Sequence, residues 1–188
     1  MVILIAIVVV VAVLAIAVLG YYNGFVAKRN LAAQAFSTID VMLTKRADLV
    51  PNLVATVKEY MGYEAGTLTK ITELRARALD RNLPADERVR ANDDLGQGLR
   101  GLMVQLENYP QLKANENFLN LQHSLNEVEE QIAASRRTCN AAVTSYNTSL
   151  EMFPGSVVAN WFSFGKKPLL EATERERVAP RVGDLFRS

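Results

Sequence analysis

The chain has 188 residues, a formal net charge of +1 and one cysteine. A chain so close to neutrality has no strong positive field, which argues against nucleic-acid binding. A single cysteine excludes an intramolecular disulfide and fits a reducing compartment. Apart from its apolar N-terminus, the chain holds enough sequence for one domain.

An uninterrupted apolar run opens the chain, from Val2 to Leu19, without a charged residue, a proline or a glycine. At about 1.5 Å per residue a helix of this length spans roughly 27 Å, close to the bilayer's hydrocarbon core of about 30 Å. In lipid a helix satisfies its own backbone hydrogen bonds. We therefore predict a transmembrane anchor over residues 1–20. The competing interpretation is a cleavable signal peptide, which would have a basic leader and a shorter apolar stretch.

The residues after this run predict its orientation. Tyr21 and Tyr22 stand where aromatic rings settle at the headgroup level. Lys28 and Arg29 follow, whereas no basic side chain precedes the run. The positive-inside rule then predicts a single-pass plasma-membrane protein with its N-terminus outside and its C-terminal domain in the cytoplasm.

A helical spacing of apolar residues extends from residue 25 to about residue 80. The phase of the spacing continues through Pro51 and Gly62, which favours one bent but continuous helix. A break at Pro51 is the alternative, because proline removes a backbone hydrogen bond and disfavours the helical conformation at the residue before it.

The next helix is predicted over residues 84–108, with Pro84 as its first residue. Its apolar face consists of Leu95, Leu99, Leu102 and Leu106. Three glycines, Gly96, Gly98 and Gly101, each cost about 1 kcal/mol relative to alanine. This helix therefore needs tertiary packing, and the glycines are places where a neighbour can approach closely.

The clearest pattern is a heptad seam over residues 118–153, typical of a coiled-coil-like helix. Its members are Phe118, Leu121, Leu125, Val128, Ile132, Ser135, Cys139, Ala142, Tyr146, Ser149 and Phe153. No segment shows strand alternation. The prediction is an all-α fold, a transmembrane helix followed by an antiparallel bundle of about four helices over residues 21–164, with a charged C-terminal tail over residues 165–188.

A short amphipathic piece over residues 156–164 carries Trp161, Phe162 and Phe164. We expect it to be a lid over the apolar end of the bundle. The alternative is a second membrane contact or a partner patch next to Lys166 and Lys167.

Few side chains are candidates for chemistry. His123 is the only histidine and lies off the seam, so we expect it on the surface without a catalytic partner. Cys139 lies on the seam, where it would serve as a buried small apolar residue. The spacings of metal sites and phosphate loops are absent. We therefore predict no catalytic, metal-ligating or cofactor-binding residues, and no cofactor.

Arg46 is the exception, because it falls on the apolar stripe between Met42 and Leu49. A buried arginine needs a carboxylate or carbonyl partner, which here would lie on a facing helix. Alternatively its stem packs and its guanidinium reaches water.

Two sequence blocks resemble the bacterial LemA family, and the likeness covers nearly the whole chain. They are Arg46-Ala47-Asp48-Leu49-Val50-Pro51-Asn52-Leu53-Val54 with Val57-Lys58-Glu59-Tyr60, and Asn140, Val143, Tyr146-Asn147 and Phe153-Pro154, with Tyr109-Pro110, Leu121-Gln122, Glu129 and Arg136 between them. The family ending is loosely matched by Pro180, Val182 and Phe186. The resemblance implies a single-pass membrane protein with a helical cytoplasmic domain, and no known catalytic activity or catalytic residues.

The sequence thus predicts a non-enzymatic, membrane-anchored helical bundle that docks or scaffolds other proteins, held in the bilayer through residues 2–19. It does not identify the protein partner. The alternative is a small-ligand-binding protein or an enzyme with its site between helices near Arg46.

Overall fold

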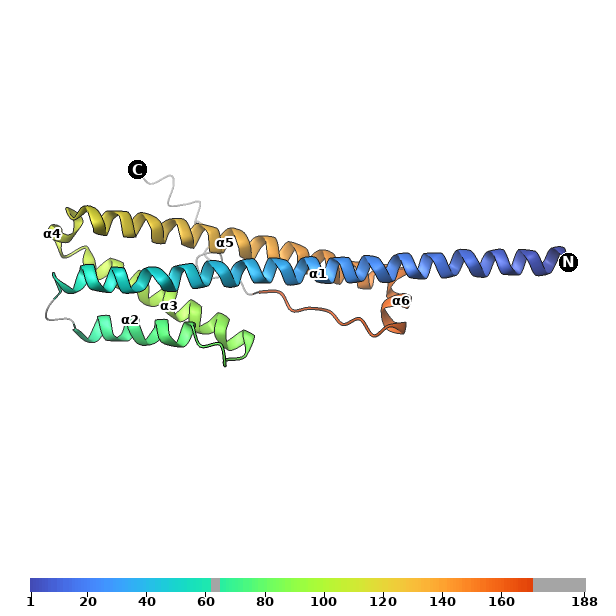
Figure 1. The fold of residues 1–188 in the computed structure, drawn as a ribbon, viewed down its shortest axis with the longest axis horizontal. Helices are drawn as coiled ribbons and strands as arrows, with labels where there is room; N and C mark the ends of the chain where they lie inside the picture. Colours follow the sequence, from blue (N-terminus) through green and yellow to red (C-terminus); the bar gives the residue numbers. More distant parts are fainter. Residues whose placement is uncertain (62–64, 171–188) are drawn as a thin grey trace, which may run out of the picture. The chain divides into compact units, whose positions relative to one another are not determined.

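The computed structural model describes residues 1–61 and 65–170, and in these residues all the regular structure is helical. The helices are α1 (Val2–Lys58), α2 (Ala65–Ala78), α3 (Ala85–Leu106), α4 (Pro110–Lys113), α5 (Glu116–Glu151) and α6 (Gly155–Trp161) (Figure 1). The predicted all-α fold with an N-terminal apolar helix is confirmed.

Helix α1 continues through Pro51, as predicted, but it ends at Lys58 instead of continuing through Gly62. The backbone N–H groups of Tyr60 and Met61 both bond the Val57 carbonyl oxygen, at 3.0 Å each, which closes a turn. Helix α2 then packs on α3 as a separate helix. The prediction of one helix was wrong here because apolar spacing alone does not register a reversal of chain direction.

The described residues form two compact units, each with its own core. Unit 1 contains residues 1–39 and 134–170, and unit 2 contains residues 40–133. Helices α1 and α5 contribute to both units. Each unit is described by itself below.

The core of unit 2 is built from α1, α2, α3, α4 and α5, together with Met61. Its buried members include Val50, Leu53, Val57, Met61, Leu68, Ile71, Leu95, Leu99, Leu102, Leu106, Leu112 and Phe118. The four predicted leucines of α3 all face this core. A Cβ atom at Gly98 would lie only 2.9 Å from the Cδ1 atoms of Ile71 and Leu74, so this glycine permits the close approach of α2 to α3.

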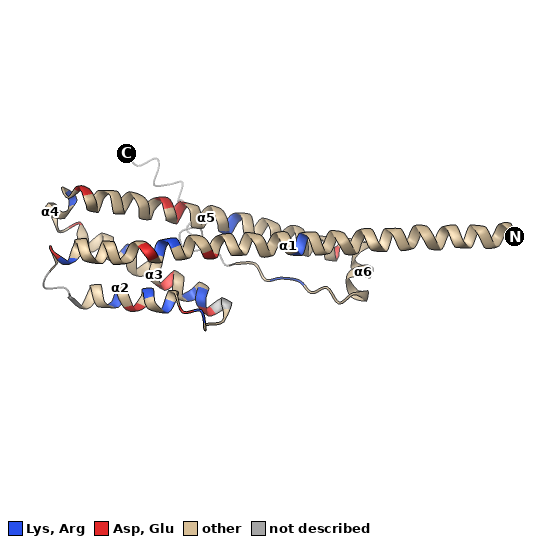
Figure 2. Cartoon of the chain, viewed as in Figure 1, with Lys and Arg blue, Asp and Glu red and all other residues tan. Residues whose placement is uncertain are grey.

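Unit 1 combines the first part of α1, the second half of α5, helix α6 and residues 162–170. Its core contains Phe25, Tyr146, Leu150, Val158 and Ala159. The apolar run of α1 is exposed and carries no charged side chain (Figure 2). It has a mean hydropathy of 3.7, and α1 is long and apolar enough there to cross a membrane.

The predicted α5 seam is buried at most positions of its first half and at Cys139 and Tyr146 of its second half, but the other four positions of the second half are not buried. Phe118, Leu125, Val128 and Ile132 are buried as predicted. Further along, the buried positions are Arg136, Val143 and Leu150, in place of Ser135, Ala142 and Ser149, and Phe153 is 83% exposed. A straight α-helix has 3.6 residues per turn, so its buried face drifts from a strict seven-residue repeat by about 20° per heptad.

Candidate functional site

Arg46 is buried in unit 2, with only 3% of its side chain exposed. Its Nη1 donates a hydrogen bond to Oε1 of Glu129 on α5, at 2.8 Å. Its Nη2 donates to the backbone carbonyl oxygen of Asn92 on α3. The prediction of a partner on a facing helix is confirmed, whereas the alternative of a guanidinium in water is wrong because the head group itself is enclosed.

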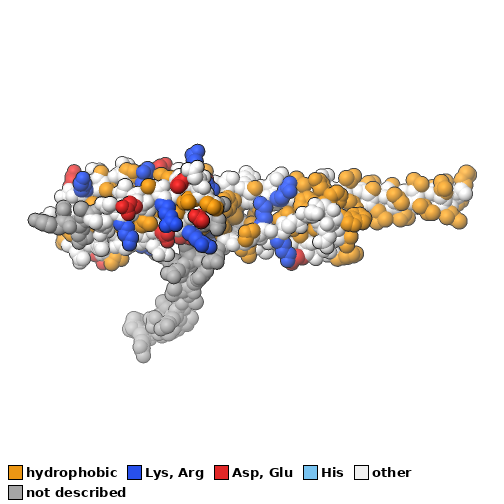
Figure 3. Space-filling view, turned by 90° about the horizontal axis from the view of Figure 1, so that it is seen from below, with side chains coloured by type: hydrophobic (Ala, Val, Ile, Leu, Met, Phe, Trp, Pro, Cys, Tyr) orange, Lys and Arg blue, Asp and Glu red, His pale blue; other side chains and the backbone are white. Residues whose placement is uncertain are grey.

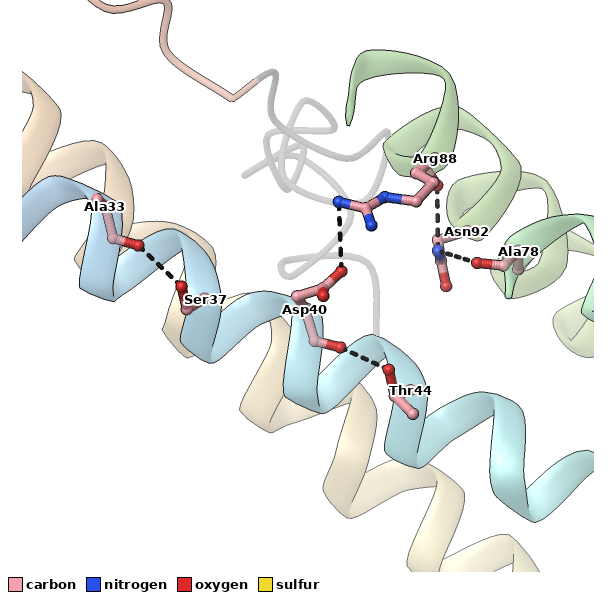
Figure 4. Close-up of polar contacts among 7 residues, drawn as sticks. All are labelled: Ala33, Ser37, Asp40, Thr44, Ala78, Arg88 and Asn92. Carbon is pink, nitrogen blue, oxygen red and sulfur yellow. Dashed lines mark hydrogen bonds and ion pairs between the residues drawn. The ribbon is translucent and has the colours of Figure 1, made fainter. Parts of the chain in front are cut away.

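Further polar contacts extend from this ion pair. The side-chain amide of Asn92 donates to the carbonyl oxygens of Ala78 and Arg88, at 3.2 and 3.0 Å (Figure 4). Arg88 forms an ion pair with Asp40 of α1 at 3.9 Å (Figure 4).

One more contact joins α2 to α1, where Nε of Arg75 donates to the Ala47 carbonyl oxygen at 2.8 Å. We call these side chains the Arg46 network: Arg46, Glu129, Asn92, Arg75, Arg88 and Asp40. The network links α1, α2, α3 and α5 inside unit 2.

The contacts of the Arg46 network join neighbouring helices. The guanidinium groups of Arg46 and Arg75 both bond to neighbouring helices. Both guanidinium groups are directed at a carboxylate or at backbone carbonyl oxygens. Among the described residues no group of three His, Cys, Asp or Glu side chains could hold a metal ion. The network therefore fixes how the helices of unit 2 fit together.

Two glycines of α3, Gly96 and Gly101, allow a test of how closely Arg46 packs against this helix. A Cβ atom at Gly96 would lie 2.7 Å from Nη1 of Arg46, whereas nothing lies within 4 Å of such an atom at Gly101. Gly96→Ala should displace the guanidinium from its partners and lower the free energy of unfolding by about 1–3 kcal/mol. Gly101→Ala should raise it by up to about 1 kcal/mol, because alanine favours the helix.

Chemical denaturation of both variants, followed by circular dichroism, measures the two effects. Equal stabilisation by the two alanines would show that Arg46 does not occupy the place beside Gly96.

The other two candidates from the sequence, His123 and Cys139, were expected to have no chemical role. His123 is exposed, as predicted. Cys139 is buried, as predicted, and its burial raises the pKa of the thiol above the ordinary value, partly offset by the positive charge of Lys167. The thiol is therefore protonated at neutral pH and is a poor nucleophile.

An asparagine ladder on α5 holds the segment that follows α6. Asn147 donates to the Lys167 carbonyl oxygen at 2.8 Å and accepts from the Lys167 N–H at 2.9 Å. Asn140 makes the same pair of bonds with Leu170, at 3.0 and 2.9 Å. The Tyr146 hydroxyl donates to the Gly165 carbonyl oxygen at 3.1 Å. Residues 165–170 are thereby fixed along α5.

Sequence reasoning missed this role. The available signal was the spacing of the two asparagines, which lie seven residues apart and so two turns apart on one helix face. A side-chain amide offers a donor and an acceptor together, which matches one residue of an extended backbone. The remainder of the predicted tail, residues 171–188, lies outside the described residues.

Two surface grooves accompany these contacts. The groove of unit 2 has a volume of about 430 Å³ and is lined by Asn52, Ala55, Thr56, Asn117, Asn120, Leu121 and Ser124. The groove of unit 1 has a volume of about 530 Å³ and is lined by Ala17, Gly20, Tyr21, Gly24, Phe25, Lys28, Ser145, Thr148, Ser149, Met152 and Phe153. Neither groove contains Arg46.

Comparison with known proteins places these residues in a family. The family model described as the LemA family matches residues 35–183. The chain belongs to the LemA family. The region matched includes the Arg46 network and the asparagine ladder. Arg46, Glu129, Asn140, Tyr146 and Asn147, on which the resemblance was based, all make the contacts described above.

Individual relatives are distant in sequence. Protein LemA of Metamycoplasma hominis is 25% identical over 166 residues, which cover 88% of this chain and 76% of the relative. Magnetosome protein MamQ of Magnetospirillum gryphiswaldense is 22% identical, and magnetosome protein MamQ 1 of Paramagnetospirillum magneticum is 24% identical. Each of these two matches covers 73% of this chain and only 60% of the relative. LemA family membership and the apolar N-terminal part of α1 together indicate a membrane-anchored protein.

Proposed function

We propose that this LemA family protein is a membrane-anchored docking module. Residues 2–19 hold it in the bilayer, and the groove of unit 2 binds a segment of a partner protein. The observation that carries the proposal is the chemistry of that groove, which contains three asparagine side chains, one serine and one threonine but no charged residue.

Such a lining suits a peptide better than a small charged metabolite. Backbone amides both donate and accept hydrogen bonds, and so do the side chains of Asn117, Asn120 and Ser124. The amides of Asn117 and Asn120 make no hydrogen bond with any residue that the structure describes, so both are available to a ligand. A phosphate or carboxylate would instead need a cation in the groove.

The groove of unit 2 differs from the surroundings of Arg46 in what its lining residues contact. The two helices that line the groove, α1 and α5, are both anchored in the core of unit 2. Their opposite sides contribute the buried residues Leu53, Val57, Phe118 and Leu125 to that core. The guanidinium of Arg46 is by contrast engaged with Glu129 and Asn92 and lines neither groove. The proposed docking site is therefore the groove of unit 2 and not the surroundings of Arg46.

Site-specific photo-crosslinking in native membranes tests the docking role. A photoreactive phenylalanine placed at Asn120 of the full chain should form a defined protein adduct. The same residue at the exposed Asn126, on the opposite face of α5, is the matched control and should form none. Asn117→Arg should remove the adduct formed from position 120, because its long charged side chain would fill the groove. Absence of an adduct from position 120, or equal adducts from both positions, would contradict the proposal.

We also propose that the helical units lie in the cytoplasm and the N-terminus outside. Lys28 and Arg29 support this orientation, because basic residues next to a span are retained on the cytoplasmic side. A protease added to intact cells should leave residues 21–188 uncut and should degrade them after lysis, as an immunoblot against a C-terminal tag would show. Cleavage in intact cells would reverse the assignment.

A further inference from the structure

The segment from the end of α5 through α6, residues 152–162, presents a set of large apolar side chains to solvent. Met152 is 63% exposed, Phe153 83%, Val157 47%, Trp161 74% and Phe162 49%. We call these five residues the apolar patch. Single exposed apolar residues are ordinary in soluble proteins, but several from one short segment mark an interaction surface.

Helix α6 is held firmly although its outer face is exposed. Val158 and Ala159 are buried with Phe25 in the core of unit 1. A Cβ atom at Gly155 would lie 2.6 Å from the Ser149 carbonyl oxygen and 3.2 Å from Cζ of Phe25, so only glycine allows this approach. Helix α6 thus covers the core of unit 1 through Val158 and Ala159, while Trp161, which was expected in the lid, remains on its outer face.

The apolar patch lies level with the end of the membrane-spanning run of α1. Met152 and Phe153 line the groove of unit 1 together with Ala17, in the last turn of that run, and Gly20, which directly follows it. The Phe162 ring packs on the Tyr22 ring with centroids 5.0 Å apart. Figure 3 shows hydrophobic side chains gathered where α1 leaves the rest of unit 1.

Two basic side chains of α1, Lys28 and Arg29, follow on the side away from the membrane-spanning run. Lys28 of α1 donates to the Ser145 carbonyl oxygen at 3.5 Å. The guanidinium of Arg29 lies 5.6 Å from the centroid of the Phe164 ring. Lys166 forms an ion pair with Glu151. The order along unit 1, from apolar and aromatic side chains to cations, matches the order of layers in a bilayer, from hydrocarbon through the interface to the headgroups.

We propose that the apolar patch dips into the same bilayer leaflet from which α1 emerges, so that unit 1 contacts the membrane at a second place beside its anchor. The partner is the lipid surface, because the patch is continuous with the lipid-facing part of α1 and meets it at the depth of Ala17 to Tyr22. This inference rests on the proposed anchoring of residues 2–19 and does not depend on docking at the groove of unit 2.

Trp161 is the only tryptophan in the chain, so its fluorescence reports on the patch alone. The full chain would be reconstituted into vesicles of phosphatidylcholine and phosphatidylglycerol, and flotation would first establish that it is anchored. Acyl chains brominated near the glycerol end should lower Trp161 emission about two-fold, because interfacial tryptophan sits at that depth. Aqueous acrylamide should quench it weakly.

Two variants sharpen this test. Phe153→Asp should draw the patch out of the lipid and reduce quenching by the brominated lipids. Val104→Asp, at an exposed apolar position of α3 in unit 2, is the matched control and should leave quenching unchanged.

The remaining outcomes overturn the proposal. Strong quenching by acrylamide with none by brominated lipid would place Trp161 in water. Shielding from both quenchers would show that protein, either a second copy or another chain, covers the patch. Failure to float would remove the anchor and the inference together, whereas failure of crosslinking at Asn120 would affect only the docking role.

Discussion

Ile132→Asp is expected to unfold the helical part of this protein outside the anchor, and Val128→Asp to do the same. The two wild-type side chains are only 4% and 1% exposed. A carboxylate buried there without a partner costs several kcal/mol, against the about 5–15 kcal/mol by which a typical domain is stable. Thermal melts of the full chain in mild detergent, followed by circular dichroism, should show a large loss of helical signal at temperatures where the wild type is folded.

His123→Ala is the control on the same helix. Its side chain is exposed, and substitutions at such positions usually change stability by less than about 0.5 kcal/mol. The control should melt with the wild type. A melt of His123→Ala as early as that of Ile132→Asp would show that the buried face of α5 between residues 118 and 132 is wrongly assigned.

Glu129→Ala is expected to destabilise unit 2 by about 3 kcal/mol, because it leaves the guanidinium of Arg46 buried without its counter-charge. Arg46→Leu should cost less than Glu129→Ala. The Glu129 side chain is 31% exposed, so water can solvate its carboxylate once Arg46 is gone. Denaturant titrations of the two single variants give the order directly.

The double variant Arg46→Leu with Glu129→Leu removes both charges of the ion pair at once. Replacing a buried ion pair by apolar residues is often close to neutral, so the double variant should be more stable than Glu129→Ala alone. The control is Gln131→Ala, on the same helix as Glu129. It removes only a surface hydrogen bond from Lys45 of α1 and should change the free energy of unfolding little. If Glu129→Ala has no more effect than Gln131→Ala, then Arg46 is not buried as a charged group.

Local pattern was sufficient for the features that depend on neighbours within a few turns. The apolar run before Tyr21 was enough to predict a helix long enough to span a membrane. The leucines of α3 lie on one face, so their spacing located both the helix and its buried side. The position of Arg46 on an apolar stripe required a partner on a facing helix, and the structure has one. The motif around Arg46 and Pro51 also indicated the LemA family, which the family comparison bears out.

Tertiary structure alone decided what depends on residues far apart in the chain. The reversal after Lys58 leaves the apolar phase unchanged, so spacing did not reveal it. Glu129 lies 83 residues from Arg46, and many carboxylates have a similar sequence context. The asparagine ladder was invisible for the same reason, because Asn140 and Leu170 are 30 residues apart. The exposure of Trp161 also depended on packing, because a short amphipathic helix can turn either face inward. The close approach of Gly155 to Phe25 places Val158 and Ala159 in the core and leaves Trp161 outside.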